Sequence, residues 1–397
     1  MLDSLLPEYD FLVIGGGPAG LLAALTLSAS KEPYRIALID KRDPWREPVS
    51  CAEAVSKRGL EALVPKVDAE WVRGPIDGVF FIAPDGTRVD FEKKDSGLLI
   101  NRALMHKRLA EESQRRGVHC NFRTRATSLS KLENGFRTVK YEGEPAGELR
   151  TKVVIDCSGP GLGFGQGEKI TQGNFDVEPA LFALVEGLEY PTNYIQLFFG
   201  HNYAPGGYAW LFPRDQQVAN VGLVVGRDYA KHVPARQAMK HFIETTYPGA
   251  RISTVQGGAI PCGFPAEPLA VDNLYKAGDA GNMVNPISRA GILEAMTGGK
   301  FAAEAALKTI AKNDEKDRLA HYAEYKARWE KDYGNSNRRI GKAKKTFMAI
   351  PDSVLNKAAH SLVKIPPQKR TLARIFLATM WNSPSLLWKM RGLFSAK

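Results

Sequence analysis

The chain has 397 residues, of which 44% are hydrophobic and 24% are charged, a composition typical of globular proteins without long disordered stretches. This length exceeds what one simple core usually requires, so we expect two or three structural units. The net charge of +11 is concentrated at the C-terminus, because residues 333–397 contain thirteen Lys and Arg and a single acid, Asp352.

The cysteines and the apolar runs exclude several classes of protein. Cys51, Cys120, Cys157 and Cys262 show no CxxC spacing and no cluster with histidine, which argues against a metal site and a disulfide framework. The N-terminus has no basic segment before an apolar stretch, and no run of about eighteen apolar residues occurs. We therefore expect no metal, no signal peptide and no membrane-spanning helix, and we expect a cytoplasmic location.

The first forty residues follow the order strand, glycine-rich turn, helix, strand. A short buried strand over 9–14 enters the turn Gly15-Gly16-Gly17-Pro18-Ala19-Gly20, and a helix and a second strand follow. Gly15 permits the tight turn, Gly17 lets the backbone approach a pyrophosphate, and Gly20 lets the helix pack against the sheet. The helix begins at Pro18 and Ala19, and its N-terminus directs free N–H groups and a positive dipole end at the phosphates.

The second strand ends at Asp40, which is followed by Lys41. An acid at this point accepts hydrogen bonds from ribose hydroxyls and favours an unphosphorylated ribose, which indicates FAD or NAD rather than NADP. The fingerprint predicts a dinucleotide site that includes Asp40 and Lys41. It does not distinguish FAD from NAD.

The middle of the chain is rich in predicted strands, at 78–83, 87–91, 181–187, 194–199, 207–212 and 218–225. Within the fifth of these, Tyr208, Trp210 and Phe212 alternate, so their side chains lie on one face. They form either the core of a sheet or the aromatic wall of an apolar pocket. We favour the pocket wall, which would bind an apolar substrate.

A second predicted flavin contact lies near the end of the folded region. A strand leads into Gly278-Asp279, and a helix is predicted over 292–310, preceded by Gly291. Asp279 supplies a carboxylate for ribityl hydroxyls, and the helix N-terminus at Gly291 and Ile292 lies towards the flavin ring. The glycine-rich stretch 159–167 is not followed by an apolar helix, so the chain has no second dinucleotide fingerprint. These features indicate FAD.

The residues above resemble the flavoprotein superfamily of p-hydroxybenzoate hydroxylase, and within it the geranylgeranyl reductase family. The resemblance covers roughly 9–310 and includes Leu99-Ile100-Asn101-Arg102 and the segment 153–159. The segment Pro205-Gly206-Gly207-Tyr208-Ala209-Trp210-Leu211-Phe212-Pro213 matches that family's P-x-x-Y-x-W-x-F-P pattern. In that superfamily the residue matching Arg102 lies near the FAD, and Asp156 belongs to the segment that closes the FAD-binding sheet.

The resemblance implies an α/β protein in which a Rossmann-like FAD-binding domain carries an inserted mixed β-sheet substrate domain and a helical C-terminal region. We expect the discontinuous FAD-binding domain at 1–72, 96–160 and 270–310. The substrate-binding sheet domain is expected at 73–95 and 161–269, and the basic helical region at 311–397.

The resemblance also implies a reaction. A reductase of this family adds hydride from flavin N5 and a proton across C=C bonds of an isoprenoid chain, in a geranylgeranyl lipid, a polyprenyl compound or a quinone tail. Cys51 is the candidate proton donor, because the resembled reductases carry a Cys-Gly-Glu-type sequence here; this chain has Ala52 in place of the glycine. Cys51 could also be a buried small apolar residue. Glu53 is the alternative proton relay.

Other activities remain open on the sequence alone. A monooxygenase or hydroxylase acting on an apolar or aromatic substrate uses the same fold, and an electron-transfer flavoprotein could reduce quinone. A flavin halogenase is disfavoured, because no Trp-x-Trp-x-Ile sequence is found. The candidate electron donors are NAD(P)H, ferredoxin and a reduced quinol.

The basic segment 333–397 has a predicted amphipathic helix over 370–381. Aromatic residues and leucines mixed with Lys and Arg are typical of peripheral attachment to an anionic membrane. The alternative is a helical cap with a solvated basic face. Nucleic-acid binding is disfavoured, because no nucleic-acid-binding fold or base-stacking motif accompanies the charge.

Overall fold

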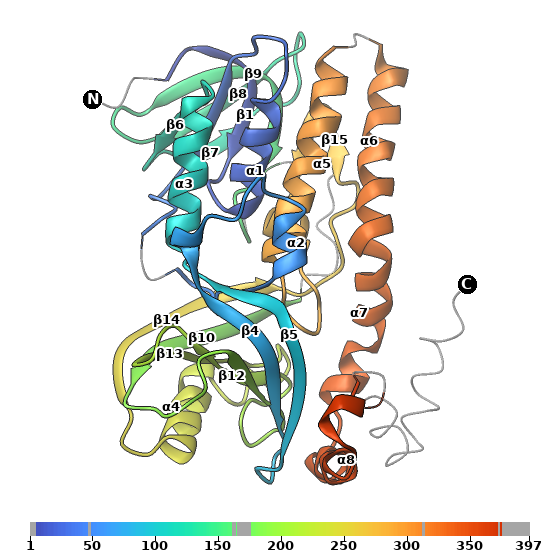
Figure 1. Cartoon of the computed structure of the whole chain (residues 1–397). Helices are drawn as coiled ribbons and strands as arrows, with labels where there is room; N and C mark the ends of the chain where they lie inside the picture. The colour runs from blue at the N-terminus through green and yellow to red at the C-terminus, as the bar shows by residue number, and fades with distance from the viewer. Residues whose placement is uncertain are drawn as a thin grey trace. The chain divides into compact units, whose positions relative to one another are not determined.

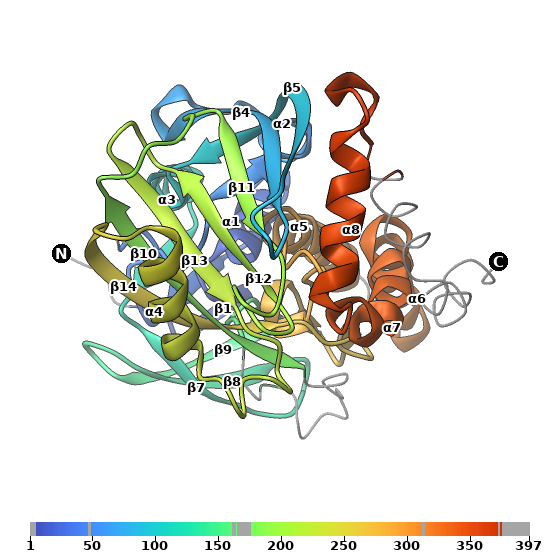
Figure 2. The same cartoon turned by 90° about the horizontal axis from the view of Figure 1, so that it is seen from below.

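The computed structural model describes residues 5–46, 49–160, 164, 176–311, 314–371 and 374. The chain forms two compact units, each assembled from three segments. The first unit consists of 1–49, 102–176 and 261–338, and the second of 50–101, 177–260 and 339–397. Figures 1 and 2 show the elements of both units in two orientations.

The first unit is built on a sheet whose central strands are parallel. The strand order is β15-β16-β9-β1-β2-β6, and β8 pairs with β9 and with β7 (Figure 1). Its strands are β1 (Glu8–Ile14), β2 (Ile36–Asp40), β6 (His119–Phe122), β7 (Arg125–Leu129), β8 (Arg137–Glu142), β9 (Gly147–Asp156), β15 (Ala270–Val271) and β16 (Leu274–Lys276). The pairs β1–β2, β1–β9, β2–β6 and β9–β16 are parallel, so their carboxyl ends lie at the same edge.

Helix α1 is the buried centre of this unit. All its residues except Thr26 are buried, because nearly every position is small or aliphatic. α1 contacts α3 and α5, and α6 packs against α5 (Figure 1). The helical segments of the unit are α1 (Pro18–Leu27), α3 (Arg102–Arg115), η3 (Gly278–Gly281), α5 (Ile292–Ile310), α6 (Glu315–Trp329) and η4 (Glu330–Gly334).

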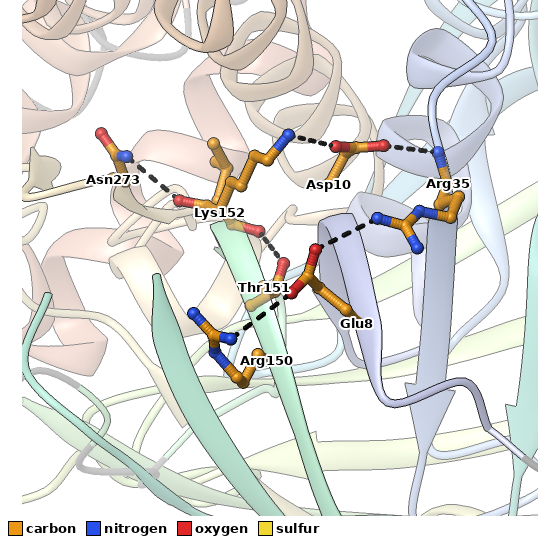
Figure 3. Close-up of polar contacts among 8 residues, drawn as sticks. Glu8, Asp10, Arg35, Arg150, Thr151, Lys152 and Asn273 are labelled. Atoms are coloured by element: carbon orange, nitrogen blue, oxygen red, sulfur yellow. Dashed lines mark hydrogen bonds and ion pairs between the residues drawn. The ribbon is translucent and has the colours of Figure 1, made fainter. Parts of the chain in front are cut away.

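Polar contacts join the strands of this sheet away from the glycine turn (Figure 3). Buried Asp10 on β1 accepts a hydrogen bond from Lys152 Nζ at 2.8 Å and another from the Arg35 backbone N–H at 2.8 Å. Burial alone would raise the pKa of Asp10, but these two donors lower it overall. Asn273 Nδ2 donates to the Lys152 carbonyl at 3.0 Å, which joins the turn before β16 to β9.

The second unit is built on a mixed sheet with strand order β14-β10-β13-β12-β11-β4-β5-β3. Its strands are β3 (Ala54–Ser56), β4 (Val72–Ile82), β5 (Arg88–Ile100), β10 (Val177–Glu186), β11 (Tyr194–Phe198), β12 (Tyr208–Pro213), β13 (Val218–Val224) and β14 (Arg251–Pro261). Strands β11 and β4 are parallel, whereas β12 pairs antiparallel with both β11 and β13. The short helices α2 (Lys57–Glu61) and η1 (Ala69–Trp71) lie between β3 and β4 in the chain.

The two faces of this sheet differ. One face carries Ala209 and Leu211 and packs against Met239 and Phe242 of α4 (Ala235–Thr246). Figure 2 shows α4 beside the strands of this sheet. The other face has Phe182, Trp210 and Val224 at its centre. Apart from Ala52, every described member of that second cluster lies on a strand.

The C-terminal helices are α7 (Asn335–Met348), α8 (Asp352–Val363) and the short η5 (Pro367–Lys369). Helix α8 packs on β5 and carries two histidine–aspartate contacts, His201 Nδ1 to Asp352 at 3.0 Å and His360 Nε2 to Asp85 at 2.8 Å. A buried ion pair joins Lys344 of α7 to Glu178 of β10 at 2.8 Å. The expected helix over 370–381 lies almost entirely outside the described residues.

The predicted fold class is confirmed: a Rossmann-like sheet accompanies a mixed sheet. The observed division of the chain differs from the expected boundaries in several places. Residues 261–269 belong to the first unit rather than to the substrate-binding sheet domain. Residues 54–56 pair with 97–99, and β5 runs as far as Ile100, so 50–72 and 96–101 belong to the second unit rather than to the FAD-binding domain. The expected region 311–397 is divided within α7.

Candidate functional site

The glycine turn after β1 has the backbone conformation that its sequence predicts. Gly15 has φ of +108°, and a Cβ atom there would lie 2.2 Å from the Cys157 carbonyl oxygen, so only glycine fits. A Cβ atom on Gly20 would lie 1.8 Å from the Gly15 carbonyl oxygen. Gly17 differs, because no described atom lies within 4 Å of its Cβ position. The start of α1 thus combines a close-packed turn with open space at Gly17.

Asp40 stabilises this turn through its carboxylate. Its Oδ2 accepts the Gly16 N–H at 2.6 Å, and its Oδ1 accepts the Arg42 N–H at 2.8 Å. Each oxygen keeps a further lone pair, so ribose hydroxyls can still donate to Asp40. The neighbouring Lys41 is exposed.

Asp279 and Arg102 interact electrostatically, although they are far apart in the sequence. Asp279 lies in η3, after Gly278, whose φ is +64° and whose Cβ would lie 3.0 Å from Ala19 Cβ. Burial raises the pKa of the Asp279 carboxyl, and the Arg102 guanidinium opposes that effect. The arginine therefore stabilises the carboxylate form that accepts hydroxyl hydrogen bonds.

His106, which our reading of the sequence missed, supports Arg102. Its Nδ1 lies 2.8 Å from the Pro44 carbonyl oxygen, and Arg102 Nε donates to its Nε2 at 3.2 Å. Because a carbonyl only accepts, Nδ1 carries the proton and Nε2 is free to accept from Arg102. Burial, followed by the Arg102 charge, lowers the pKa of His106 to about 3, which keeps the ring neutral. The separation of four residues on one helix was the available signal.

Helix α5 begins where the sequence predicted, with Gly291 as N-cap and Ile292 as first residue. It crosses α1 very closely, because a Cβ on Gly299 would lie 2.0 Å from the Ala19 carbonyl oxygen. Gly298 is similarly restricted by Met283. The small residues of α5 therefore allow it to pack closely against the start of α1, which follows the glycine turn.

Asp156 is placed differently from the other predicted cofactor residues. Its side chain is fully buried, lies 3.4 Å from Lys276 Nζ, and accepts the Ser158 hydroxyl and backbone N–H. These contacts join the ends of β9 and β16, next to Cys157, whose carbonyl restricts Gly15. Its role towards FAD stays a prediction.

The residues around the glycine turn and Asp279 fit the chemical groups of FAD. The open space at Gly17 can admit a pyrophosphate, Asp40 can accept ribose hydroxyls, and Asp279 with Arg102 offers a charged acceptor for further hydroxyls. Among the described residues, no group of His, Cys, Asp and Glu could hold a metal ion.

The aromatic strand β12 lies in the second unit. Tyr208, Trp210 and Phe212 share one face, with ring centroids separated by 6.1 and 6.5 Å along the strand. Trp210 is buried, and its indole lies over Gly222, whose Cβ would lie 2.3 Å from the ring. Tyr208 and Phe212 are half-buried. The prediction that they line a pocket remains untested.

The segment 51–53 forms a tight turn in the same unit. The Glu53 N–H donates to Cys51 Sγ at 3.2 Å, and the Glu53 carbonyl accepts the Ile100 N–H at 2.8 Å. Glu53 has φ of +64°, so the left-handed conformation lies there and not at Ala52. The absence of a glycine at position 52 is therefore compatible with the turn.

The Glu53 side chain is buried between two arginines that our sequence reading did not single out. Its Oε2 lies 3.9 Å from Arg73 Nε and 3.8 Å from Arg214 Nε. Both arginines are largely buried, so their charges are only weakly screened. This surrounding favours a charged carboxylate at Glu53.

Comparison with known proteins places the chain in a family. A model of the geranylgeranyl reductase catalytic domain matches residues 176–260, and one of lycopene cyclase protein matches 10–177. The digeranylgeranylglycerophospholipid reductase of Methanosarcina acetivorans is 32% identical over 97% of this chain and 96% of its own length. The chain belongs to the geranylgeranyl reductase family. Digeranylgeranylglycerophospholipid reductase 1 of Methanococcoides burtonii is 30% identical over 98% of the chain and 96% of its own length.

The solved structures agree with the fold. A geranylgeranyl bacteriochlorophyll reductase-like protein from Thermoplasma acidophilum superimposes with a TM-score of 0.87 at 24% identity, covering 97% of this chain and 99% of that one. Membership of the geranylgeranyl reductase family confirms the predicted resemblance, and the protein is an FAD-dependent oxidoreductase. No helix in the described part of the chain has the length and apolar character needed to cross a membrane.

Proposed function

We propose that this protein hydrogenates C=C bonds in the geranylgeranyl chains of a glycerophospholipid. The observation that carries the proposal is its identity of 30–32% with relatives named digeranylgeranylglycerophospholipid reductases, over almost the whole length of both chains. The strand β12, with its family pattern, agrees with an apolar substrate. An isolated alkene is electron-rich, so its reduction requires a proton as well as a hydride.

FAD is held by the first unit in this proposal. The turn Gly15, Gly17, Pro18, Ala19 and Gly20 binds the pyrophosphate, and Asp40 with Lys41 binds the ribose. Gly278, Asp279 and Arg102 bind the ribityl chain, and the start of α5 at Gly291 and Ile292 lies towards the ring. Asp156 supports the end of the sheet. Bound there, FAD supplies the hydride.

The apolar face of the second sheet binds the isoprenoid chain in this proposal. Tyr208 and Phe212 offer partly exposed rings, and Trp210 supports them from the buried centre of the strand. Aromatic and aliphatic surfaces bind an alkyl chain by removing apolar area from water, without any need for charge. Excluding water also prevents loss of the hydride to solvent.

Cys51 is the proposed proton donor. Its S–H bond breaks as a C–H bond forms on one alkene carbon, the hydride forms the other C–H bond, and the π bond is lost. Water then returns a proton to the thiolate. The Glu53 N–H stabilises the thiolate by donating to Sγ. Glu53 is the alternative proton relay: its carboxylate, which lies between Arg73 and Arg214, would take a proton from water and pass it to the alkene carbon.

The electron donor in this proposal is NAD(P)H or ferredoxin, bound transiently. The chain has one dinucleotide fingerprint, which the proposed FAD occupies, so the donor is expected to bind without a domain of its own.

Peripheral contact with an anionic membrane is also proposed, through the basic segment 333–397. Arg339, Lys342 and Lys345 are exposed at intervals of three residues on α7, so they form one basic stripe. Lys344 points inward to Glu178 instead. Anionic headgroups would attract the stripe and thereby bring the protein to its lipid substrate.

The activity can be tested with the full-length, FAD-loaded protein, reduced with dithionite and kept free of oxygen. Adding digeranylgeranylglycerophospholipid should reoxidise the flavin, which absorbance spectroscopy records. The fully saturated lipid is the matched control and should leave the flavin reduced. Reoxidation by oxygen or quinone but not by the unsaturated lipid would contradict the proposal.

A further inference from the structure

A chain of hydrogen bonds links the family pattern on β12 to the Cys51 turn. Asn220 on β13 is 1% exposed and lies opposite Phe212 in the antiparallel pair of strands. Trp210 Nε1 donates to Asn220 Oδ1 at 2.9 Å. Asn220 Nδ2 donates to the Cys51 carbonyl at 2.8 Å, although the two residues are 169 positions apart.

These partners fix the orientation of the Asn220 amide. An indole N–H can only donate, and a backbone carbonyl can only accept. The amide oxygen must therefore point to Trp210 and the amide nitrogen to Cys51, and a flipped amide would lose both bonds. A fully buried group with two obligatory partners has little freedom to move.

The Cys51–Glu53 turn is consequently held at three backbone points. The Asn220 amide donates to the Cys51 carbonyl, and the Glu53 N–H donates to Cys51 Sγ. The Ile100 N–H donates to the Glu53 carbonyl. Ala52 also packs against the cluster centred on Trp210. A turn with a non-glycine residue at φ of +64° needs such support, because the left-handed conformation is unfavourable for Glu53.

We propose that Asn220 is a positioning residue that fixes the Cys51 thiol against the Glu53 N–H, and that Trp210 acts through Asn220. Its importance for the reaction rests on the proposed role of Cys51 as proton donor. In this proposal the aromatic residues of β12 bind the apolar chain, and Trp210 among them also orients the turn that carries the Cys51 thiol.

Two ion pairs with arginines are described at this turn. Arg73 and Arg214 flank the Glu53 carboxylate, and the Asn220 amide and the Trp210 indole are neutral. Replacing Asn220 by Leu therefore changes no charge. Any change in thiol ionisation in that variant reports on the geometry of the turn.

Alkylation of Cys51 by iodoacetamide tests the proposal without any alkene substrate. Cys120, Cys157 and Cys262 are buried, and burial raises the pKa of Cys120 to about 12, so Cys51 should be the fast-reacting thiol in the folded holoenzyme. Peptide mass spectrometry identifies the modified residue. The rate is measured against pH, and its midpoint reports the ionisation of Cys51.

Asn220→Leu should raise this midpoint by about half a pH unit. Without the bond from Asn220 the turn shifts, and the Glu53 N–H no longer donates to the Cys51 thiolate. Trp210→Phe should shift it in the same direction by less. If Asn220→Leu does not fold, the neutral variant Asn220→Ala also removes both hydrogen bonds and should raise the midpoint. An unchanged midpoint in a folded Asn220 variant would overturn the proposal.

Asn273→Leu is the matched control. Asn273 makes the same kind of bridge, accepting the Tyr322 hydroxyl and donating to the Lys152 carbonyl, but far from Cys51 in the sequence and in the other unit. It should leave the midpoint unchanged, and an equal shift there would also overturn the proposal. If Asn220 variants shift the midpoint while Cys51→Ser still reduces alkene, the positioning role stands and the proton-donor role fails.

Discussion

Cys51 differs from the other cysteines of the chain in its surroundings. It is partly exposed and accepts a backbone N–H, whereas burial raises the pKa of both Cys120 and Cys157 well above the usual range. A serine at position 51 keeps the size of the side chain but is a far weaker acid. Replacing Cys51 alone by serine therefore tests whether its thiol transfers the proton.

Cys51→Ser should lower the rate of alkene reduction about a hundredfold while FAD remains bound, because a positioned acid contributes roughly that much. Anaerobic single-turnover kinetics measure the rate, and the flavin spectrum measures FAD content. Cys120→Ala is the control and should retain the wild-type rate. A wild-type rate in Cys51→Ser would exclude Cys51 as the proton donor.

His106 predicts a pH dependence of stability. Its pKa is about 3 in the folded protein and about 6.5 when unfolded, so between these values the unfolded chain binds more protons and the free energy of unfolding rises with pH. From pH 5 to pH 7 this residue should contribute about 2 kcal/mol, and the gain should level off as the pH rises further above the unfolded pKa.

His106→Gln should remove that contribution, which urea unfolding at pH 5 and pH 7 measures. The exposed His241→Gln should keep the full difference. An identical pH dependence in wild type and His106→Gln would show that His106 is not held neutral.

Asp40, Asp279 and the glycine turn could be predicted because each belongs to a local motif with a fixed spacing. Asn220 and Arg214 could not be predicted, because Cys51 and Glu53, which they contact, lie in a turn far away in the sequence. The left-handed backbone at Glu53 was also missed, because residues other than glycine seldom adopt it.

Elements with strong local patterns matched the structure closely. Helix α5 spans Ile292–Ile310, as the sequence predicted. Strand β5 was harder, because its last part pairs through Gly97, Leu98 and Leu99 with β3 across a long separation. Local pattern indicates that a strand exists, but the choice of its partner depends on the whole sheet.

The crossing of α1 and α5 gives a prediction at the element scale. Gly299→Ala should lower the free energy of unfolding by about 1–3 kcal/mol and weaken FAD retention, because its Cβ would overlap the Ala19 carbonyl and force the helices apart. Thermal unfolding and gel-filtered flavin content measure both effects. Gly74→Ala, which meets no described atom within 4 Å, is the control. Full FAD retention in Gly299→Ala would contradict the close crossing.

At the scale of the whole molecule, the described part of the basic C-terminus contains both residues that pack against the fold and exposed basic residues. Lys344 and α8 are structural, since one pairs with Glu178 and the other packs on β5. Deleting 333–397 would therefore expose core and disturb the fold. The exposed stripe on α7 can be changed without removing either contact.

Replacing Arg339, Lys342 and Lys345 together by Gln should weaken binding to anionic vesicles at least about tenfold, because each basic residue contributes about 1 kcal/mol. Vesicle sedimentation at low and physiological salt measures the effect. Replacing the exposed Lys231, Lys240 and Arg251 by Gln is the charge-matched control. Equal binding by both triple variants would refute a specific role for the stripe.

The central claim, that the protein reduces isoprenoid double bonds, is tested most directly by the mass of the product. Digeranylgeranylglycerophospholipid is incubated with the reduced, FAD-loaded protein without oxygen, and the lipid is analysed by mass spectrometry. The account predicts a gain of two hydrogen atoms for each double bond reduced. An unchanged lipid, or one that gains oxygen only when air is admitted, would contradict it.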